Sequence, residues 1–240
     1  MRDLDYFFFA LSITVDSMSD LERAKMAAGY AAADLIRDGM VVGLGTGSTV
    51  RYFIEKLGQR CKGGLSIKAV ASSVATEELA NKAGIPLISE FLQIDITVDG
   101  ADFVDSQQRI IKGAGGALLR EKILAFNSRR LIIIIDESKQ VSNFPQGCLF
   151  PVEITPFGHS ATISRLGFPG RLRTKNGKPY ITDNQNLIFD IELMGYDVEL
   201  VHEKAQKIPG VIETGLFLHL ANELIIGSSN GSAKVVKCKN

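Results

Sequence analysis

Short apolar runs alternate with helical stretches through the first half of the chain, and this alternation constrains the fold more than any other feature. The run LIIIID (131–136) carries apolar side chains on both faces up to its last residue, which is typical of a strand buried on both sides. Helices between such strands predict an α/β fold with a mostly parallel sheet and helices on both faces. The predicted strands are 40–45, 66–72, 86–90, 95–101 and 131–136, and the predicted helices are 48–59, 75–84 and 116–127.

The pattern changes near Phe150. The segment 171–193 contains two turn signals, Asn176-Gly177 and Asp183–Asn186, which predict an antiparallel meander. Around this segment we expect a short strand and a helix in 151–167, a helix in 196–210, a strand in 211–218 and a hairpin in 223–239 that turns at Asn230-Gly231.

These elements predict two domains. Residues 18–149 and 224–240 form the larger one, and residues 150–223 form a smaller α+β domain. A helix start signal follows Met18, because Ser19 or Asp20 can cap a helix. We therefore expect the ordered chain to begin near Met18, and residues 1–17 to be a disordered or non-native extension.

Composition excludes several classes of partner. Lys and Arg together number 27, as do Asp and Glu, so the formal net charge is zero; we expect no nucleic-acid binding, which needs excess positive charge. No apolar run approaches the roughly 20 residues that cross a bilayer, so no membrane partner is expected. The cysteines (Cys61, Cys148 and Cys238) and the histidines (His159, His202 and His219) lie too far apart in sequence to indicate a zinc site or a disulfide framework. Unpaired, scattered cysteines are typical of a protein of the reducing cytoplasm, so we expect a cytoplasmic location.

The segment GLGTGSTV (43–50) predicts an anion site. Its glycines leave the backbone open, and the helix that follows contributes free N–H groups and a positive dipole end. The loop lacks the lysine of a P-loop, and no acidic residue ends the next strand to hold a ribose diol. A phosphate monoester is therefore favoured over a dinucleotide. The alternative is a tight strand–helix turn with a serine cap.

Two carboxylates converge at the end of the strand in DITVDGADFVD (95–105). Asp99 closes the strand, Gly100 permits a sharp turn and Asp102 follows. Such a pair can bind hydroxyl groups, bind a metal or move protons. The competing interpretation is an Asx-turn with a helix cap.

A lysine and a buried-looking glutamate flank a glycine turn in IKGAGGALLREKILAF (111–126). Lys112 leaves a strand and can neutralise an oxyanion beside free amides. Glu121 lies in the following helix among apolar neighbours, and desolvation would raise its pKa towards that of a useful base. The alternative is a surface glutamate that pairs with Arg120 or Lys122.

Together these motifs resemble the ribose-5-phosphate isomerase type A family. GLGTGSTV, SSVATEELA, DITVDGADFVD, IKGAGGALLREK and DESKQV occur in order, and the likeness runs from Met18 to the C-terminus. The resemblance implies a Rossmann-like domain, a homodimer or homotetramer, and a metal-independent enzyme without a cofactor. It also implies interconversion of ribose 5-phosphate and ribulose 5-phosphate through an ene-diolate, in the non-oxidative pentose phosphate pathway.

The resemblance also assigns site residues. Glu121 corresponds to the catalytic base, and Asp99, Asp102 and Lys112 complete the catalytic set. Ala114 stands where some members have glycine. The residues implied to contact the sugar phosphate are Lys25, Thr46, Gly47, Ser48, Thr49, Asp99, Gly100, Ala101, Asp102, Lys112, Gly113, Ala114, Gly115 and Lys139.

Three other functions stay open at this point. A sugar-phosphate isomerase-deaminase or a CoA transferase can share the core, and so can a sugar-phosphate-sensing domain. Sensors of this fold group usually carry a helix-turn-helix before the core, and the residues before the first helix are too short and too apolar for one. The presence of both Asp99 and Glu121 also favours catalysis.

Overall fold

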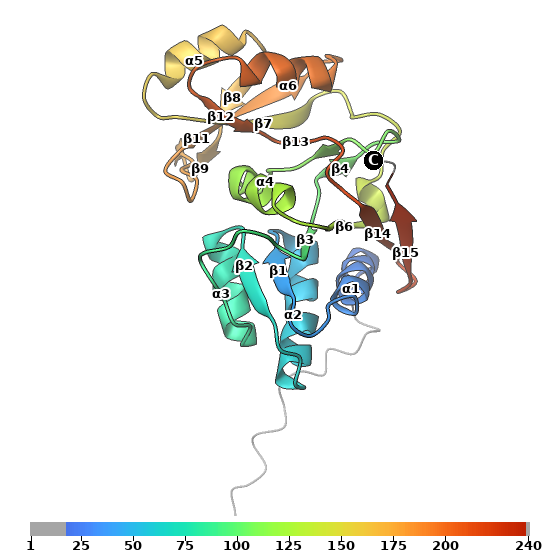
Figure 1. Ribbon diagram of the computed structural model, residues 1–240. Coiled ribbons are helices and arrows are strands. Elements are labelled where there is room, and N and C mark those ends of the chain that lie inside the picture. Colours follow the sequence, from blue (N-terminus) through green and yellow to red (C-terminus); the bar gives the residue numbers. More distant parts are fainter. Residues whose placement is uncertain (1–17, 239–240) are drawn as a thin grey trace, which may run out of the picture.

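The computed structural model describes residues 18–238, and a six-stranded sheet forms its centre (Figure 1). The strand order is β15-β14-β6-β3-β1-β2, and every pairing is parallel except that between β14 and β15. The predicted α/β class is therefore confirmed. The strands are β1 (Val41–Leu44), β2 (Lys68–Ala71), β3 (Ile96–Asp99), β6 (Leu131–Asp136), β14 (Glu223–Gly227) and β15 (Ala233–Lys237).

Helices and a small sheet cover the two faces of this sheet. In β6, Ile132 and Ile134 pack with α1 (Asp20–Ala33) and α2 (Ser48–Lys62). Ile133 and Ile135 point the other way because side chains alternate along a strand. They pack with Ala125 of α4 and with residues of the small sheet. The remaining elements on these faces are α3 (Val74–Ala83), α4 (Leu118–Phe126), and the strands β4 (Phe103–Val104), β5 (Ile110–Ile111) and β13 (Leu216–Phe217).

A second, antiparallel sheet lies at the other end of the molecule from α2 and α3, with α5 and α6 beside it (Figure 1). Its order is β12-β7-β11-β8. The predicted meander is only partly correct, because β8 pairs directly with β11 while β9 and β10 form a separate hairpin. The elements are β7 (Cys148–Ile154), α5 (His159–Leu166), β8 (Gly170–Leu172), β9 (Thr174–Lys175), β10 (Lys178–Pro179), β11 (Leu187–Leu193), α6 (Val198–Gln206) and β12 (Val211–Thr214). The domain boundaries at 150 and 223 stay a prediction.

The strand expected at 86–90 is wrong. Only one parallel bridge forms there, between Leu87 and Ala69. Ala69 donates its N–H to the carbonyl of Pro86, and its own carbonyl accepts from Ile88. Pro86 has no N–H to extend the ladder, so the segment touches β2 at one point and then leaves the sheet edge.

The strand expected at 211–218 is divided at Gly215. Its first part is β12 in the antiparallel sheet, and its second part is β13 in the small sheet. Gly215 donates to the carbonyl of Pro151 and accepts from the N–H of Lys112. A Cβ at this position would lie 2.2 Å from the carbonyl oxygen of Lys112. Glycine is therefore required where the chain passes from one sheet to the other.

The start of the first helix agrees with the sequence. Helix α1 begins at Asp20, and the hydroxyl of Ser19 accepts the N–H of Glu22 at 3.3 Å. Residues 1–17, expected to be an extension, lie outside the described residues. Among the helices of residues 18–238, none is both long and apolar enough to cross a membrane.

Candidate active site

The predicted site residues meet in one cavity of about 120 Å³. Strands β1 and β3 run in the same direction, so the loops that follow them open on the same edge of the sheet. Nearly all the predicted residues line this cavity: Thr46, Gly47, Ser48, Thr49, Gly100, Ala101, Asp102, Lys112, Gly113, Ala114, Gly115, Glu121 and Lys139.

Two helices begin at this cavity without a side-chain cap. Helix α2 has Gly47 at its N-cap and α4 has Ala117, and neither side chain can accept a hydrogen bond. By contrast, Ser19 and Ser73 cap α1 and α3. The first-turn N–H groups of α2 and α4 are therefore available to an anion, and the helix dipoles favour negative charge there.

Thr46 holds the loop between β1 and α2 in place. Its hydroxyl lies 2.8 Å from those of Ser72 and Ser73, and its N–H donates to Asp99 Oδ1. The threonine side chain therefore anchors the loop against the start of α3. Gly45 is needed in the same loop, because a Cβ there would lie 2.1 Å from Asp99 Oδ1.

Lys112 lies between two buried carboxylates. Its Nζ is 3.0 Å from Asp99 Oδ1, 3.2 Å from Glu121 Oε1 and 2.6 Å from the carbonyl oxygen of Gly100. The three residues are 4% exposed or less. Asp99 Oδ2 and Glu121 Oε2 are also buried, and neither has a hydrogen-bond partner within residues 18–238. Native structures hold few buried polar atoms without partners, and each calls for an explanation; Asp136 and Glu153 contribute the other two among the described residues.

The cluster shifts the pKa of each member. Burial and, to a smaller extent, the negative charge of Asp99 raise the pKa of Glu121, Lys112 opposes both, and the net result is a pKa of about 8. Burial likewise raises the pKa of Asp99 against the effect of Lys112. For Lys112, burial disfavours the ammonium, but the two carboxylates outweigh it and raise the pKa. Lys112 therefore stays charged, and Glu121 can exchange a proton near neutral pH.

The other predicted residues take varied positions. Asp102 accepts the N–H of Ala114 at 2.9 Å and so holds the glycine turn. Lys139 lines the cavity from the 3-10 turn Glu137–Lys139. Lys25 does not line it; its Nζ pairs with Glu22 Oε1 at 3.1 Å. The predicted contact between Lys25 and substrate stays a prediction.

Two residues that the sequence analysis did not assign to the site contact the glycine turn. Arg173 and Tyr180 donate hydrogen bonds to its carbonyl oxygens from the region of the antiparallel sheet. Tyr180 begins the segment YITDNQNLIFD, which shares the family resemblance, but no contact with the turn was expected of it, and both residues are distant from the turn in sequence. The only available signal is the Asn176-Gly177 turn, which places the two residues on opposite sides of one hairpin.

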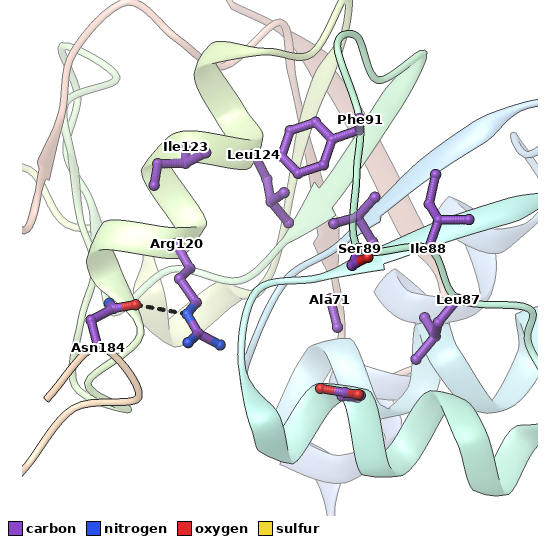
Figure 2. A pocket seen from close by; sticks show the side chains of 11 residues that line it. Ala71, Leu87, Ile88, Ser89, Phe91, Arg120, Ile123, Leu124 and Asn184 are labelled. Atoms are coloured by element: carbon purple, nitrogen blue, oxygen red, sulfur yellow. Dashed lines mark hydrogen bonds between the residues drawn. The ribbon is translucent and has the colours of Figure 1, made fainter.

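A larger cavity of about 560 Å³ lies beside α4 and has a different character (Figure 2). Its lining is mostly apolar, and Arg120 Nε is already bonded to Asn184 Oδ1 at 2.8 Å. Consecutive helical residues point in different directions, so Arg120 borders this cavity while Glu121 borders the smaller one. The smaller cavity is lined by Glu121, whose buried Oε2 has no partner among the described residues, and by Lys112. Asp99 does not itself line this cavity, but Lys112 contacts it. We therefore take the smaller cavity as the candidate active site. Within residues 18–238, no group of three or more His, Cys, Asp or Glu is placed to hold a metal ion.

Comparison with known sequences identifies the family. The sequence profile described as ribose 5-phosphate isomerase A (phosphoriboisomerase A) matches residues 68–231. Ribose-5-phosphate isomerase A of Bacillus mycoides (strain KBAB4) is 48% identical over 217 residues, which cover 86% of this chain and 96% of that protein. The chain belongs to the ribose 5-phosphate isomerase A family. The protein of the same name from Protochlamydia amoebophila (strain UWE25) is 44% identical over 89% of this chain and 95% of its own length.

Solved structures of ribose 5-phosphate isomerases have the same fold. The enzyme of Methanocaldococcus jannaschii matches with a TM-score of 0.84 at 34% identity, over 90% of this chain and 99% of that chain. A D-ribose-5-phosphate isomerase in complex with phospho-erythronic acid matches with a TM-score of 0.84 at 37% identity, over the same shares. The resemblance stated from the sequence motifs is therefore confirmed.

Proposed function

We propose that the chain catalyses the interconversion of D-ribose 5-phosphate and D-ribulose 5-phosphate. The observation that carries this proposal is the buried Glu121 carboxylate, which has an unpartnered oxygen and lies beside Lys112. Glu121 is in the first turn of α4, whose N-terminus has no side-chain cap. An aldose–ketose isomerisation needs a base at carbon, a proton donor and acceptor at oxygen, and stabilisation of an oxyanion. The relative solved with phospho-erythronic acid, a sugar-acid phosphate, supports a sugar-phosphate substrate.

The reaction is a proton transfer between adjacent carbons. In the open-chain aldose, Glu121 removes the proton from C2, and the electrons of that C–H bond form a double bond to C1. The charge that develops on O1 is stabilised by Lys112 and by amides of the glycine turn, and Asp99 supplies a proton to O1. Glu121 then returns its proton to C1 while O2 gives its proton to Asp99. The product is the ketose, and both carboxyl groups end in their starting states.

The phosphate is held at the other end of the cavity. The N–H groups at the start of α2 and the hydroxyls of Ser48 and Thr49 provide donors, and Lys139 provides a positive charge. Binding of this remote group keeps C1 and C2 beside Glu121, so its binding energy contributes to the reaction rate.

A coupled assay with ribose 5-phosphate in EDTA tests the proposal. We expect ribulose 5-phosphate to form at a rate that EDTA does not change. Activity that disappears on exhaustive chelation and returns with metal would contradict the expected cofactor-free reaction. Ammonia released from an amino-sugar phosphate, without isomerisation of ribose 5-phosphate, would instead indicate a deaminase.

The pH dependence of the same assay is a second prediction. Glu121 must be ionised to accept a proton, and its pKa is raised to about 8. We therefore expect kcat/KM to rise about tenfold per pH unit below pH 8. At higher pH it should fall where Asp99, which must carry a proton to supply one to O1, becomes ionised. The second ionisation of a substrate phosphate, near about pH 6, lies well below this range. A flat profile between pH 6.5 and 8.5 would contradict this role for Glu121.

We also infer that the enzyme works in the cytoplasm as a homodimer or homotetramer, as the family resemblance implies. Large apolar side chains exposed on the single chain support association with further copies, since burial of such residues is a main driving force for assembly. They include Leu92, Phe126, Phe157, Met194 and Leu200.

A further inference from the structure

Arg173 connects the antiparallel sheet to the active-site glycine turn. It follows β8 in sequence, but its guanidinium donates to the carbonyl oxygen of Gly113 at 2.7 Å and to that of Ala114 at 3.0 Å. Tyr180 adds a third contact, from its hydroxyl to the carbonyl oxygen of Gly115 at 3.1 Å. Three successive carbonyl groups of the turn are thus held from outside the Rossmann-like sheet.

Arg173 is itself held rigidly. Its Nε donates to Asp190 Oδ2 at 2.8 Å, and a second nitrogen contacts Asp190 Oδ1. Asp190 is 3% exposed and belongs to the buried strand β11. This two-point pairing fixes the plane of the guanidinium. The remaining donors are therefore aimed at the turn.

Because the peptide group is planar, the contacts to these carbonyl groups also determine the direction in which the neighbouring N–H groups point. No described peptide bond is cis, so each carbonyl and the N–H of the next residue point in opposite directions. The carbonyl of Gly113 faces Arg173, and the N–H of Ala114 accordingly reaches Asp102. The carbonyl of Ala114 also faces Arg173, which turns the N–H of Gly115 away from it. Gly115 lines the active-site cavity.

We propose that Arg173, fixed by Asp190, is a positioning residue for catalysis: it orients the Gly115 amide toward the oxygen on which charge develops. The outer antiparallel sheet thereby completes the oxyanion site of the central sheet. This inference rests on the proposed isomerase function. Without Arg173 the turn keeps its Asp102 contact but loses the bonds that set the Gly115 peptide plane.

The test compares Arg173→Met with Arg171→Met. Arg171 lies two residues earlier, is exposed, and makes only a 3.9 Å ion pair with Glu192. Loss of one oriented donor reduces turnover by up to about 100- to 1,000-fold; because the Asp102 contact remains, we expect Arg173→Met to lower kcat about 10- to 100-fold with little change in KM. Arg173→Lys should recover little of this loss, because an ammonium cannot form the planar fork. Arg171→Met should behave as wild type.

Inhibition by two ligands separates positioning from a general structural defect. Phospho-erythronic acid carries a planar carboxylate where the ene-diolate has two oxygens, so its affinity should fall in parallel with kcat/KM in Arg173→Met. Inhibition by inorganic phosphate, which needs only the α2 end of the site, should be unchanged. Equal weakening of both ligands, or wild-type kcat in a folded Arg173→Met, would overturn the proposal.

Two further measurements keep the proposal falsifiable. If Arg173→Met does not fold, Arg173→Lys keeps a positive charge beside Asp190 and should still lower kcat with KM unchanged; wild-type kcat in that variant would then count against the proposal. Hydrogen exchange of residues 113–116 tests the contacts without any turnover. Exchange should be faster in Arg173→Met than in Arg171→Met, and equal exchange would overturn the inference. Absence of isomerase activity in the wild type would instead refute the proposed function, and hydrogen exchange would still report on the Arg173 contacts.

Discussion

Replacement of Glu121 by glutamine is expected to lower kcat by at least about a hundredfold, the usual contribution of a general base. The amide has nearly the shape of the carboxyl group but cannot accept a proton from C2. Because the phosphate is held by other residues, KM should stay similar. Initial rates with ribose 5-phosphate give both constants. Exchange of the C2 hydrogen with deuterium from solvent should slow by the same factor.

Glu77→Gln is the matched control for this experiment. Glu77 lies on α3 at the edge of the larger cavity, and its side chain is exposed. The same chemical change there should leave both kcat and KM unaltered. Near-normal turnover in Glu121→Gln would remove Glu121 from the role of base. Loss of turnover in Glu77→Gln would direct attention to the larger cavity instead.

Replacement of Lys112 by methionine should affect both stability and turnover. Removal of one partner from a buried ion pair leaves uncompensated charge and typically costs about 3–5 kcal/mol of unfolding free energy. The methionine also cannot stabilise an oxyanion, so kcat should fall by at least about a hundredfold. Urea unfolding and the coupled assay measure the two effects separately.

The stability loss in Lys112→Met should depend on pH. A buried carboxyl whose pKa is above its ordinary value binds a proton more tightly in the folded state, so folding stability falls as pH rises through that range. For Glu121 the range already runs from 4.5 to about 8 in the wild type. Without Lys112 the pKa values of Asp99 and Glu121 rise further. The deficit should therefore be smaller at pH 5 than at pH 8.

Lys122→Met is the control that shows whether the loss of turnover in Lys112→Met is specific to Lys112 or follows from the loss of any ion-paired lysine. Lys122 lies on α4, is partly buried, and pairs with Glu213 at 2.7 Å outside the active-site cavity. We expect Lys122→Met to lose stability while it retains most of its turnover. Equal loss of turnover in both variants would mean that Lys112 supports the fold rather than the chemistry.

The centre of the main sheet was predictable from sequence because its inner strands, β3 and β6, are buried along their whole length. Each continuous run, such as residues 131–136, lies between segments with helical periodicity, and that combination allows few other arrangements. The strand predictions at 86–90 and 211–218 were wrong or incomplete because a few backbone hydrogen bonds determine where these strands begin and end. Pro86 removes the donor that a ladder needs, and Gly215 lets one apolar run serve two sheets. Neither effect is visible in hydrophobic periodicity.

The sequence predicted which loops form the site, but it did not predict the buried contact between Lys112 and Glu121. Glycine-rich segments after strands indicate where a ligand binds. Glu121, however, stands between Arg120 and Lys122 in sequence, a pattern that is equally typical of a solvated helix surface. In its buried position it pairs with Lys112, which directly follows strand β5. Arg173 depends in the same way on contacts distant in sequence, so local reasoning could not find it.

Gly215 connects the antiparallel sheet directly to the backbone of Lys112. Its carbonyl accepts the Lys112 N–H, and its missing side chain lets the backbone of Lys112 lie against it. Replacement of residues 150–223 by a shorter link would thus remove the hydrogen bonds that hold Lys112 and the glycine turn, even with every residue that lines the cavity retained. The part of the chain that looks like an appendage is a component of the catalyst.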